Sequence, residues 1–289
     1  MPASVSRAEA FERCRSYLAA RIARWRLAHI LLPAEARDDL TALLAWHDLG
    51  REIADSASGF ERRRNLDELA SELEAALAEK ARSPAGIALS FAVRRHGLPE
   101  ELLRRPLLEW RRDEHLATFE TREALLAHAR AVAVPEGRLF LRVLSLSSER
   151  NEALADALAL GTQLASWLVH VKRDLALGRL RLPVEDLTRH GVELGSLLQG
   201  RPSAGLARVL ASEVGWARGF FARGWPLCRE LGLWRGRKLA FVLRWQAASL
   251  SALEAARFEA LRGEPPAGWL RLLACASSSL VTLAPPRFA

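Results

Sequence analysis

The stretch QLASWLVHVKRDLALGRLRLPVEDLTRHGV, residues 163–192, decides the fold class. Its first half has the apolar spacing of an amphipathic helix, and Gly178 ends that pattern. A short extended segment then leads to Pro183, a residue that suits the first turn of a new helix. His170 and Asp174 stand four residues apart, so both lie on one helical face. A surface ion pair is one interpretation of that spacing, and a ligand-binding face is the other.

Helical periodicity continues on both sides of this stretch. Residues 56–65 indicate a loop with Asn65 as the next helix cap, and Pro135 indicates the start of a separate helix. No alternation of period two lasts long enough to predict a strand. The sequence predicts an all-α, single-domain bundle over residues 1–289, with loose ends at 1–6 and 285–289 and an interior that can hold a ligand. The expected helices cover residues 8–28, 33–56, 66–80, 84–97, 99–117, 121–133, 135–146, 149–177, 203–231, 235–262 and a last segment that ends near 283.

The chain is basic, with a formal net charge of +8 over 289 residues. A basic balance suits nucleic acid, anionic lipid or diphosphate ligands, and it also suits an ordinary solvated surface. The sequence has no zinc spacing and no run of aromatic residues interleaved with Lys and Arg, so we expect no nucleic-acid partner. It has no P-loop and no dinucleotide fingerprint, so we expect no nucleotide cofactor.

Cysteine usage and hydropathy favour a cytoplasmic protein. Cys14, Cys228 and Cys275 are far apart and lack metal-ligand spacing, which predicts reduced, buried thiols. The first residues lack an apolar signal core, and no apolar run reaches the ~18 residues of a membrane span. Residues 269–288 combine apolar side chains with Arg271 and Arg287. They indicate either weak peripheral contact at the inner membrane face or a helix packed on the bundle.

Two further groups of residues have chemically suggestive spacing. In the segment LLAWHDLGREIAD, residues 43–55, Arg51 and Asp55 share a helical face beside Glu52 and Asp48. A charged, solvent-facing stripe is the alternative. After Gly178, Arg179 and Arg181 suit a phosphate ligand, because their guanidinium groups offer several charged donors.

Aromatic side chains near these segments are candidates for lining a ligand cavity. Trp46 and Trp167 lie one helical turn from the two charged segments, and Gln163 lies one turn before Trp167. Indole faces stabilise cations, although tryptophans on helices are more often core residues. The isolated His96 and His128 indicate surface or cap positions.

Residues 163–192 resemble the second signature of squalene and phytoene synthases. That signature is a helix with Asp-x-x-x-Asp, then Gly-Arg-x-x-x-Pro, then Glu-Asp-Leu-x-x-x-Gly-Val. The matching positions are Gln163, Leu164, Leu168, Asp174, Gly178, Arg179, Leu182, Pro183, Glu185, Asp186, Leu187, Gly191 and Val192.

Other segments extend this resemblance from about residue 25 to about residue 280. Leu31, Leu32 and Pro33 with residues 51–55 are similar to the first signature, whose motif is Asp-Asp-x-x-Asp. Residues 135–139 resemble a Pro-Val-Gly-Arg turn, Asp113 matches an acidic position, and residues 243–256 resemble the final core helix. The likeness is greatest to the bacterial hydroxysqualene synthase branch.

The resemblance implies an isoprenoid-synthase-like bundle with a central apolar cavity and the two motifs facing each other across its mouth. It implies farnesyl, presqualene or similar C15–C20 prenyl diphosphates as ligands, condensed head to head or rearranged in hopanoid or carotenoid biosynthesis. In the family, both acidic motifs hold Mg²⁺. Carried over, the catalytic and metal positions are Glu52, Asp55 and Asp174, and the diphosphate-binding positions are Arg51, His170, Lys172, Arg173 and Arg179.

The chain departs from the family pattern at the metal-binding positions. Arg51 and His170 replace the leading aspartates, and Arg173 stands where the second motif often has Glu. A guanidinium cannot ligate a cation and repels one at close range, so standard Mg²⁺-dependent catalysis is not expected. Either catalysis is lost and the protein serves as a binding or assembly partner, for example of a second synthase subunit, or its own cations hold the diphosphate directly.

Overall fold

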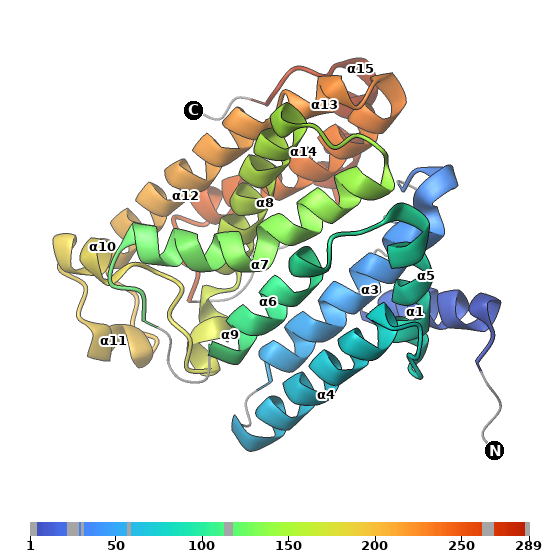
Figure 1. Ribbon diagram of the computed structural model, residues 1–289. Helices are drawn as coiled ribbons and strands as arrows, with labels where there is room; N and C mark the ends of the chain where they lie inside the picture. Colours follow the sequence, from blue (N-terminus) through green and yellow to red (C-terminus); the bar gives the residue numbers. More distant parts are fainter. Residues whose placement is uncertain are drawn as a thin grey trace. The chain divides into compact units, whose positions relative to one another are not determined.

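The computed structural model describes residues 5–21, 29, 32–56, 59–112, 118–261 and 269–286, and on the last helix it describes side chains from Leu273 onward. Every named element in these ranges is helical (Figure 1). Extended pairing in the described residues is limited to one isolated parallel bridge between Phe119 and Pro183. The predicted all-α class is therefore confirmed.

Two compact units divide the chain: residues 1–114 with 135–148, and residues 115–134 with 149–289. Unit 1 contains α1 (Arg7–Arg21), the short η1 (Ala34–Ala36), α3 (Arg37–Ala54), α4 (Gly59–Leu77), α5 (Pro84–His96), α6 (Glu100–Arg112) and the end of α7 (Arg122–Val143). Unit 2 contains the start of α7, α8 (Glu149–Val169), α9 (Val171–Ala176), α10 (Val184–Arg189), α11 (Leu194–Leu198), α12 (Ala204–Gly224), α13 (Leu227–Glu230), α14 (Leu233–Ala255) and α15 (Trp269–Val281).

The core of unit 1 is built where α1 crosses α3 and α5. Phe11 and Leu18 of α1 pack against Ala42 and Ala45 of α3 and Ala88 of α5. The alanines leave room for the larger side chains of α1, so the helices approach closely. This packing fixes α3, the helix that carries the first acidic segment.

The ends of α5 confirm their prediction, whereas the start of α4 does not. Ser83 caps α5 by accepting from the Gly86 N–H, and Gly97 ends the helix in the left-handed region at φ 56°. Helix α4 begins at Gly59, seven residues before the expected start. The reason is Arg62, which lies one helical turn before Leu66 on the buried face of α4. Its guanidinium donates to the Trp110 carbonyl oxygen at 3.0 Å.

In unit 2, α8 and α12 form the principal helix pair (Figure 1). Gly161 permits this close approach, because a Cβ at that position would lie only 3.2 Å from the Phe221 backbone nitrogen. Helix α14 packs on α8, α13 and α15. These contacts hold the end of α8, which leads into the second signature.

Two boundary predictions in the middle of the chain are wrong. Helix α7 runs through Pro135 without interruption, because buried apolar residues such as Val134 and Leu139 flank the proline and continue the packed face. The helix expected to reach residue 177 ends at Val169. There His170 forms a turn, and the Ser166 carbonyl oxygen accepts both from the His170 ring nitrogen Nδ1 at 2.7 Å and from the His170 backbone N–H at 3.1 Å.

Several predictions lie outside what the structure describes: Leu31, Asp113, residues 22–28 of the first expected helix, Arg287 and the side chain of Arg271. The predicted free, buried cysteines are confirmed. Burial raises the pKa of Cys14 to about 11 and that of Cys228 to about 12, so both remain thiols at neutral pH. Within the described ranges, no helix is both long and apolar enough to cross a membrane.

Candidate functional site

The first acidic segment forms an ionic cluster between α3 and α1 in unit 1. Asp48, whose side chain is 10% exposed, accepts hydrogen bonds from Arg51 and from the Arg21 Nε at 2.8 Å. Glu52 accepts from the Arg21 Nη1 at 2.5 Å and from the Tyr17 hydroxyl at 2.9 Å. Asp55, at the C-cap of α3, lies 3.9 Å from the Arg51 guanidinium.

The electrostatics of this cluster keep Asp48 ionised and paired. Burial alone raises the pKa of Asp48, but hydrogen bonds from Arg21 and Arg51 outweigh it and hold that pKa below its ordinary value. Burial and the hydrogen bond to Glu52 raise the pKa of Tyr17, so its neutral hydroxyl acts as the donor. The cluster is therefore an internally compensated network.

The donor set of this cluster does not fit magnesium. Mg²⁺ needs several hard oxygen ligands in near-octahedral geometry. Here Asp48 and Glu52 are already bonded to Arg21, and Arg51 occupies the leading motif position. Among the described residues, no group of three or more His, Cys, Asp or Glu side chains is arranged to hold a metal ion.

The second acidic segment lies at the junction of α8 and α9 in unit 2. Asp174 is buried on α9 and accepts from the Arg173 Nη2 at 3.0 Å. Lys172 and Arg173 are exposed on the same helix, and Arg179 is buried just after it. Counting Arg181, residues 170–181 hold four cationic side chains and one carboxylate, which is 4 − 1 = +3 with His170 neutral. Unlike the first segment, this one is strongly electropositive.

The indole of Trp167 belongs to a buried aromatic cluster that already contains a cation. The Arg181 guanidinium lies 5.3 Å from the Trp167 ring centre and 5.6 Å from that of Phe119. Arg181 Nη1 is 2.8 Å from His128 Nε2, and the His128 ring stacks on Trp167. Because a guanidinium only donates, His128 accepts this hydrogen bond at Nε2. The aromatic face expected to stabilise a ligand cation therefore holds a cation of the protein.

The surface or cap position predicted for His128 is wrong, whereas His96 is the last residue of α5, in agreement with the cap alternative. His128 is buried in this cluster, and His96 of α5 lies 2.8 Å from the buried Asp39 of α3. The contact between His96 and Asp39 joins the end of α5 to the start of α3. Both histidines are partnered by residues far away in the chain, which is why local spacing did not indicate their environment.

Trp46 lines a small apolar pocket in unit 1 together with Leu43, Trp110, Leu139 and other side chains of α3, α6 and α7. Its volume of about 20 Å³ has room for roughly one water molecule. At its rim, His47 Nε2 lies 3.5 Å from Glu136 Oε2. The pocket is too small to hold a prenyl chain. Gln163, the other expected cavity residue, is half-buried on α8 of unit 2.

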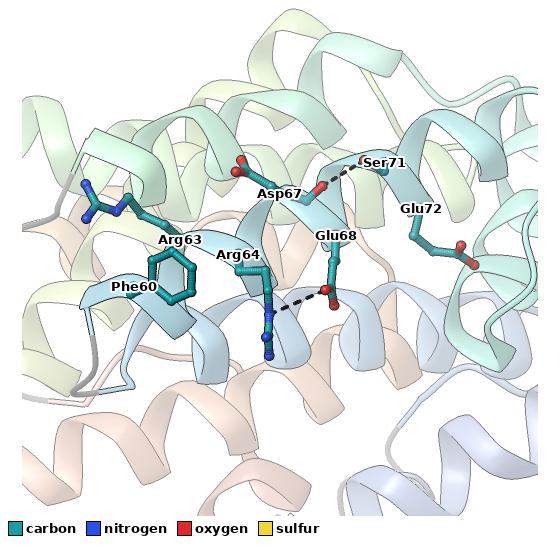
Figure 2. Close-up of a pocket in the computed structure, with 7 residues that line it drawn as sticks. All are labelled: Phe60, Arg63, Arg64, Asp67, Glu68, Ser71 and Glu72. Carbon is teal, nitrogen blue, oxygen red and sulfur yellow. Dashed lines mark hydrogen bonds and ion pairs between the residues drawn. The ribbon is translucent and has the colours of Figure 1, made fainter.

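A much larger hollow, of about 690 Å³, lies along the outer face of α4 (Figure 2). Its lining residues include Arg64 and Glu68, which pair at 3.6 Å, and Asp67, which also pairs with Arg111. None of the residues expected at the site from the sequence lines it. Its lining carries two arginines and three carboxylates, all on one face of a single helix, and we do not assign it a function.

The Glu-Asp-Leu part of the second signature anchors helices. Glu185 accepts from the Arg122 backbone N–H at 2.8 Å. Asp186, fully buried, accepts from the Arg122 Nε at 2.8 Å, and the same guanidinium donates to the buried Glu213 at 2.7 Å. These bonds join the start of α7 to α10 and α12.

The sequence did not indicate Arg21 and Tyr17 as partners of the first acidic segment, and it indicated Arg181 as a phosphate ligand and not as part of an aromatic cluster. One signal was present for the first pair, because Tyr17 is the only tyrosine of the chain and shares a helical face with Arg21. Arg181 carries no such signal, because its neighbours Phe119 and His128 come from distant parts of the sequence.

This arrangement of helices is the all-α isoprenoid synthase fold. The chain is similar to a squalene synthase of Alicyclobacillus acidocaldarius, with a TM-score of 0.79, 28% identity and coverage of 87% of this chain and 95% of that one. A dehydrosqualene synthase shares the fold with a TM-score of 0.82 at 20% identity, over 94% of this chain and 96% of that one.

The sequence model of the squalene/phytoene synthase family matches residues 25–271, and the chain belongs to that family. Among its relatives, a phytoene synthase of Thermus thermophilus is 27% identical over 93% of this chain and 92% of its own length. A 15-cis-phytoene synthase of Synechocystis sp. is 26% identical over 79% of this chain and 75% of its own length. The family predicted from the two signatures is confirmed.

Proposed function

We propose that this protein binds prenyl diphosphates and that its own cations, in place of magnesium, hold the diphosphate group at residues 170–181. The observation that carries the proposal is the charge of this segment, which has a net +3 around a single buried carboxylate. Lys and Arg form charge-assisted hydrogen bonds with phosphate oxygens. Membership of the family, together with relatives named phytoene synthases, supports a prenyl chain as the other part of the ligand.

Individual residues take different parts in this binding. Lys172 and Arg173 are exposed on α9, so their charged groups can meet a ligand from solvent. Asp174 orients the Arg173 guanidinium by accepting from its Nε and Nη2. His170 donates its Nδ1–H to the Ser166 carbonyl oxygen, which fixes the orientation of the ring.

Binding is better supported than ionisation of the ligand. An allylic carbocation needs an aromatic face, but the Arg181 guanidinium already lies 5.3 Å from the centre of Trp167. A second cation about 5 Å from Arg181 would be repelled by about 3 kcal/mol at an effective dielectric constant near 20. In unit 1, Glu52 of the first motif is bonded to Arg21 and Tyr17. Both observations favour a family scaffold kept for binding.

Calorimetry with pyrophosphate and farnesyl diphosphate, in the presence of a chelator, tests the proposal. We expect both to bind the wild-type protein without magnesium. Lys172→Ala should weaken pyrophosphate binding by about 1–3 kcal/mol, roughly ten- to a hundredfold, because one charge-assisted contact is lost. Lys80→Ala is the matched control, since Lys80 is also exposed but lies in unit 1 at the end of α4, and it should leave the affinity unchanged.

Two results would contradict the proposal in different ways. Magnesium-dependent turnover of farnesyl or presqualene diphosphate would show that the metal chemistry of the family survives despite Arg51 and His170. Absence of pyrophosphate binding with and without magnesium would show that residues 170–181 are no diphosphate site. Tight binding to a second synthase subunit would then support the role of an assembly partner.

A further inference from the structure

Helix α14 begins with two large apolar side chains that face solvent. Trp234 is 68% exposed and Leu233 is 53% exposed. They follow Gly232, which adopts φ 77° in the turn after α13. Exposed tryptophan beside exposed leucine is unfavourable in water, so such a pair on a folded surface indicates a contact with something less polar.

This apolar tip stands on a rigid base. Gly236 of α14 packs directly against α13, since a Cβ at that position would lie 1.8 Å from the Cys228 carbonyl oxygen. Cys228 is fully buried, and α13 and α14 pack against each other. The tip therefore presents its side chains in a fixed direction, without the entropic cost of ordering a loop.

Basic residues surround the tip. The Arg237 guanidinium lies 5.5 Å from the ring centre of Trp234. Residues 229–238 contain four cationic side chains and one carboxylate, which is 4 − 1 = +3. That carboxylate, Glu230, is itself paired with Arg150 at 2.8 Å. The tip thus combines two exposed apolar side chains with a basic rim, which consists of Arg229, Arg235, Arg237 and Lys238.

We infer that the tip of residues 229–238 docks on an anionic lipid bilayer, with Trp234 and Leu233 in the headgroup region and the basic rim against lipid phosphates. Tryptophan prefers this interfacial zone because its ring is apolar and its N–H is polar. A positive rim adds attraction to anionic lipids. A protein partner is less suitable, because two apolar side chains are too few for the buried core of a stable interface.

The tip suits a membrane better than α15 does. The described part of α15 exposes Leu273, Leu280 and Val281, the last at 81%. However, residues 273–281 contain no lysine or arginine, so this apolar face lacks charge complementarity to anionic lipid. The interfacial segment expected from the sequence, residues 269–288, has Arg271 and Arg287 only toward its ends. Its net charge is +2 over twenty residues against +3 over the ten residues of the tip, so the tip is the stronger candidate. The inference uses residues outside the proposed diphosphate segment and stands independently of it.

Co-sedimentation with lipid vesicles tests the inference. We expect the wild-type protein to bind vesicles of phosphatidylcholine with one-fifth phosphatidylglycerol at low salt, to bind pure phosphatidylcholine at least tenfold less, and to be released by high salt. Trp234→Ala and the double variant R235E/K238E should each lower binding about tenfold or more. Far-UV circular dichroism should be unchanged for Trp234→Ala, because the indole makes few contacts within the fold.

Two control variants make the test specific. Phe60→Ala removes a side chain that is 73% exposed on α4 and should leave vesicle binding unchanged. L280S/V281S removes the apolar face of α15 and should also leave it unchanged. The inference is overturned if the wild-type protein ignores anionic vesicles, if Trp234→Ala binds them as well as wild type, or if the α15 variant alone loses binding.

Discussion

At the scale of single residues, buried charges in this protein are compensated in groups. Arg122 illustrates this, because one guanidinium serves both Asp186 and Glu213. Two carboxylates share its charge in a buried site, and Arg189 adds a second ion pair to Asp186 only. Burial raises the pKa of Glu213 to about 7, and the attraction of Arg122 offsets this only in part.

Glu213 should make the stability of the protein depend on pH. Its pKa is about 7 in the folded protein and ordinarily 4.5, so the folded state binds the proton more tightly. The free energy of unfolding should therefore fall as pH rises from about 4.5 to about 7, by a few kcal/mol in order of magnitude. Glu213→Gln keeps an acceptor for Arg122 and removes the titration, so urea unfolding between pH 5 and 8 should show a flatter profile.

A matched control is Glu68→Gln on α4, where the side chain is 70% exposed and the pH profile should stay as in the wild type. If Glu213→Gln and wild type lose stability in parallel across this range, Glu213 does not carry the extra proton. Above pH 7 the glutamine variant should be the more stable protein, because the wild type then buries a second ionised carboxylate.

At the scale of helices, small residues set how closely neighbours approach. The turn between α13 and α14 depends on Gly236, which lies against the Cys228 carbonyl oxygen. Gly161 has a similar part between α8 and α12. Glycine has a low helix propensity, so each of these residues lowers the intrinsic stability of its own helix. Close packing of the backbone against the neighbouring helix offsets that loss.

Gly236→Ala should destabilise the protein by about 3 kcal/mol or more, because its Cβ would overlap backbone atoms that cannot move aside. Gly215→Ala is the control on α12, where a Cβ meets nothing within 4 Å. That variant should gain about 0.5–1 kcal/mol from helix propensity. Thermal unfolding should thus move the midpoints of the two variants in opposite directions. Equal shifts would show that the α13–α14 contact is not tight.

At the scale of the whole molecule, the chain passes between the two units three times, after residues 114, 134 and 148. Helix α7 itself belongs to both, with residues 122–134 in unit 2 and residues 135–143 in unit 1. Neither unit is one continuous segment. The single domain over residues 1–289 stays a prediction, and a chain that passes repeatedly between two units makes cooperative unfolding its natural test.

We therefore expect one cooperative unfolding transition. Tryptophan fluorescence and far-UV circular dichroism should give coincident curves in urea, as two-state behaviour requires. Gly236→Ala, a change in unit 2, should shift both curves by the same amount. Two separate transitions, with only one of them moved by this variant, would mean that the units unfold independently and that the single-domain prediction is wrong.

The sequence alone determined the features that depend on residues close together in the chain. Ser83, Pro84 and Gly97 predicted both ends of α5, because capping and left-handed termination involve near neighbours only. The order and spacing of the signatures predicted the family. The start of α4 was missed because the partner of Arg62 is the Trp110 carbonyl, 48 residues away.

Only the tertiary structure decided the character of the candidate site. From the sequence, Asp48 and Glu52 were available carboxylates and Trp167 was a candidate cage for a ligand cation. Packing brought Arg21 to both carboxylates and Arg181 to the Trp167 ring. The physical reason is that ion pairing and cation–π contact fall off within a few ångströms, and the distances between residues far apart in the chain are set by helix packing.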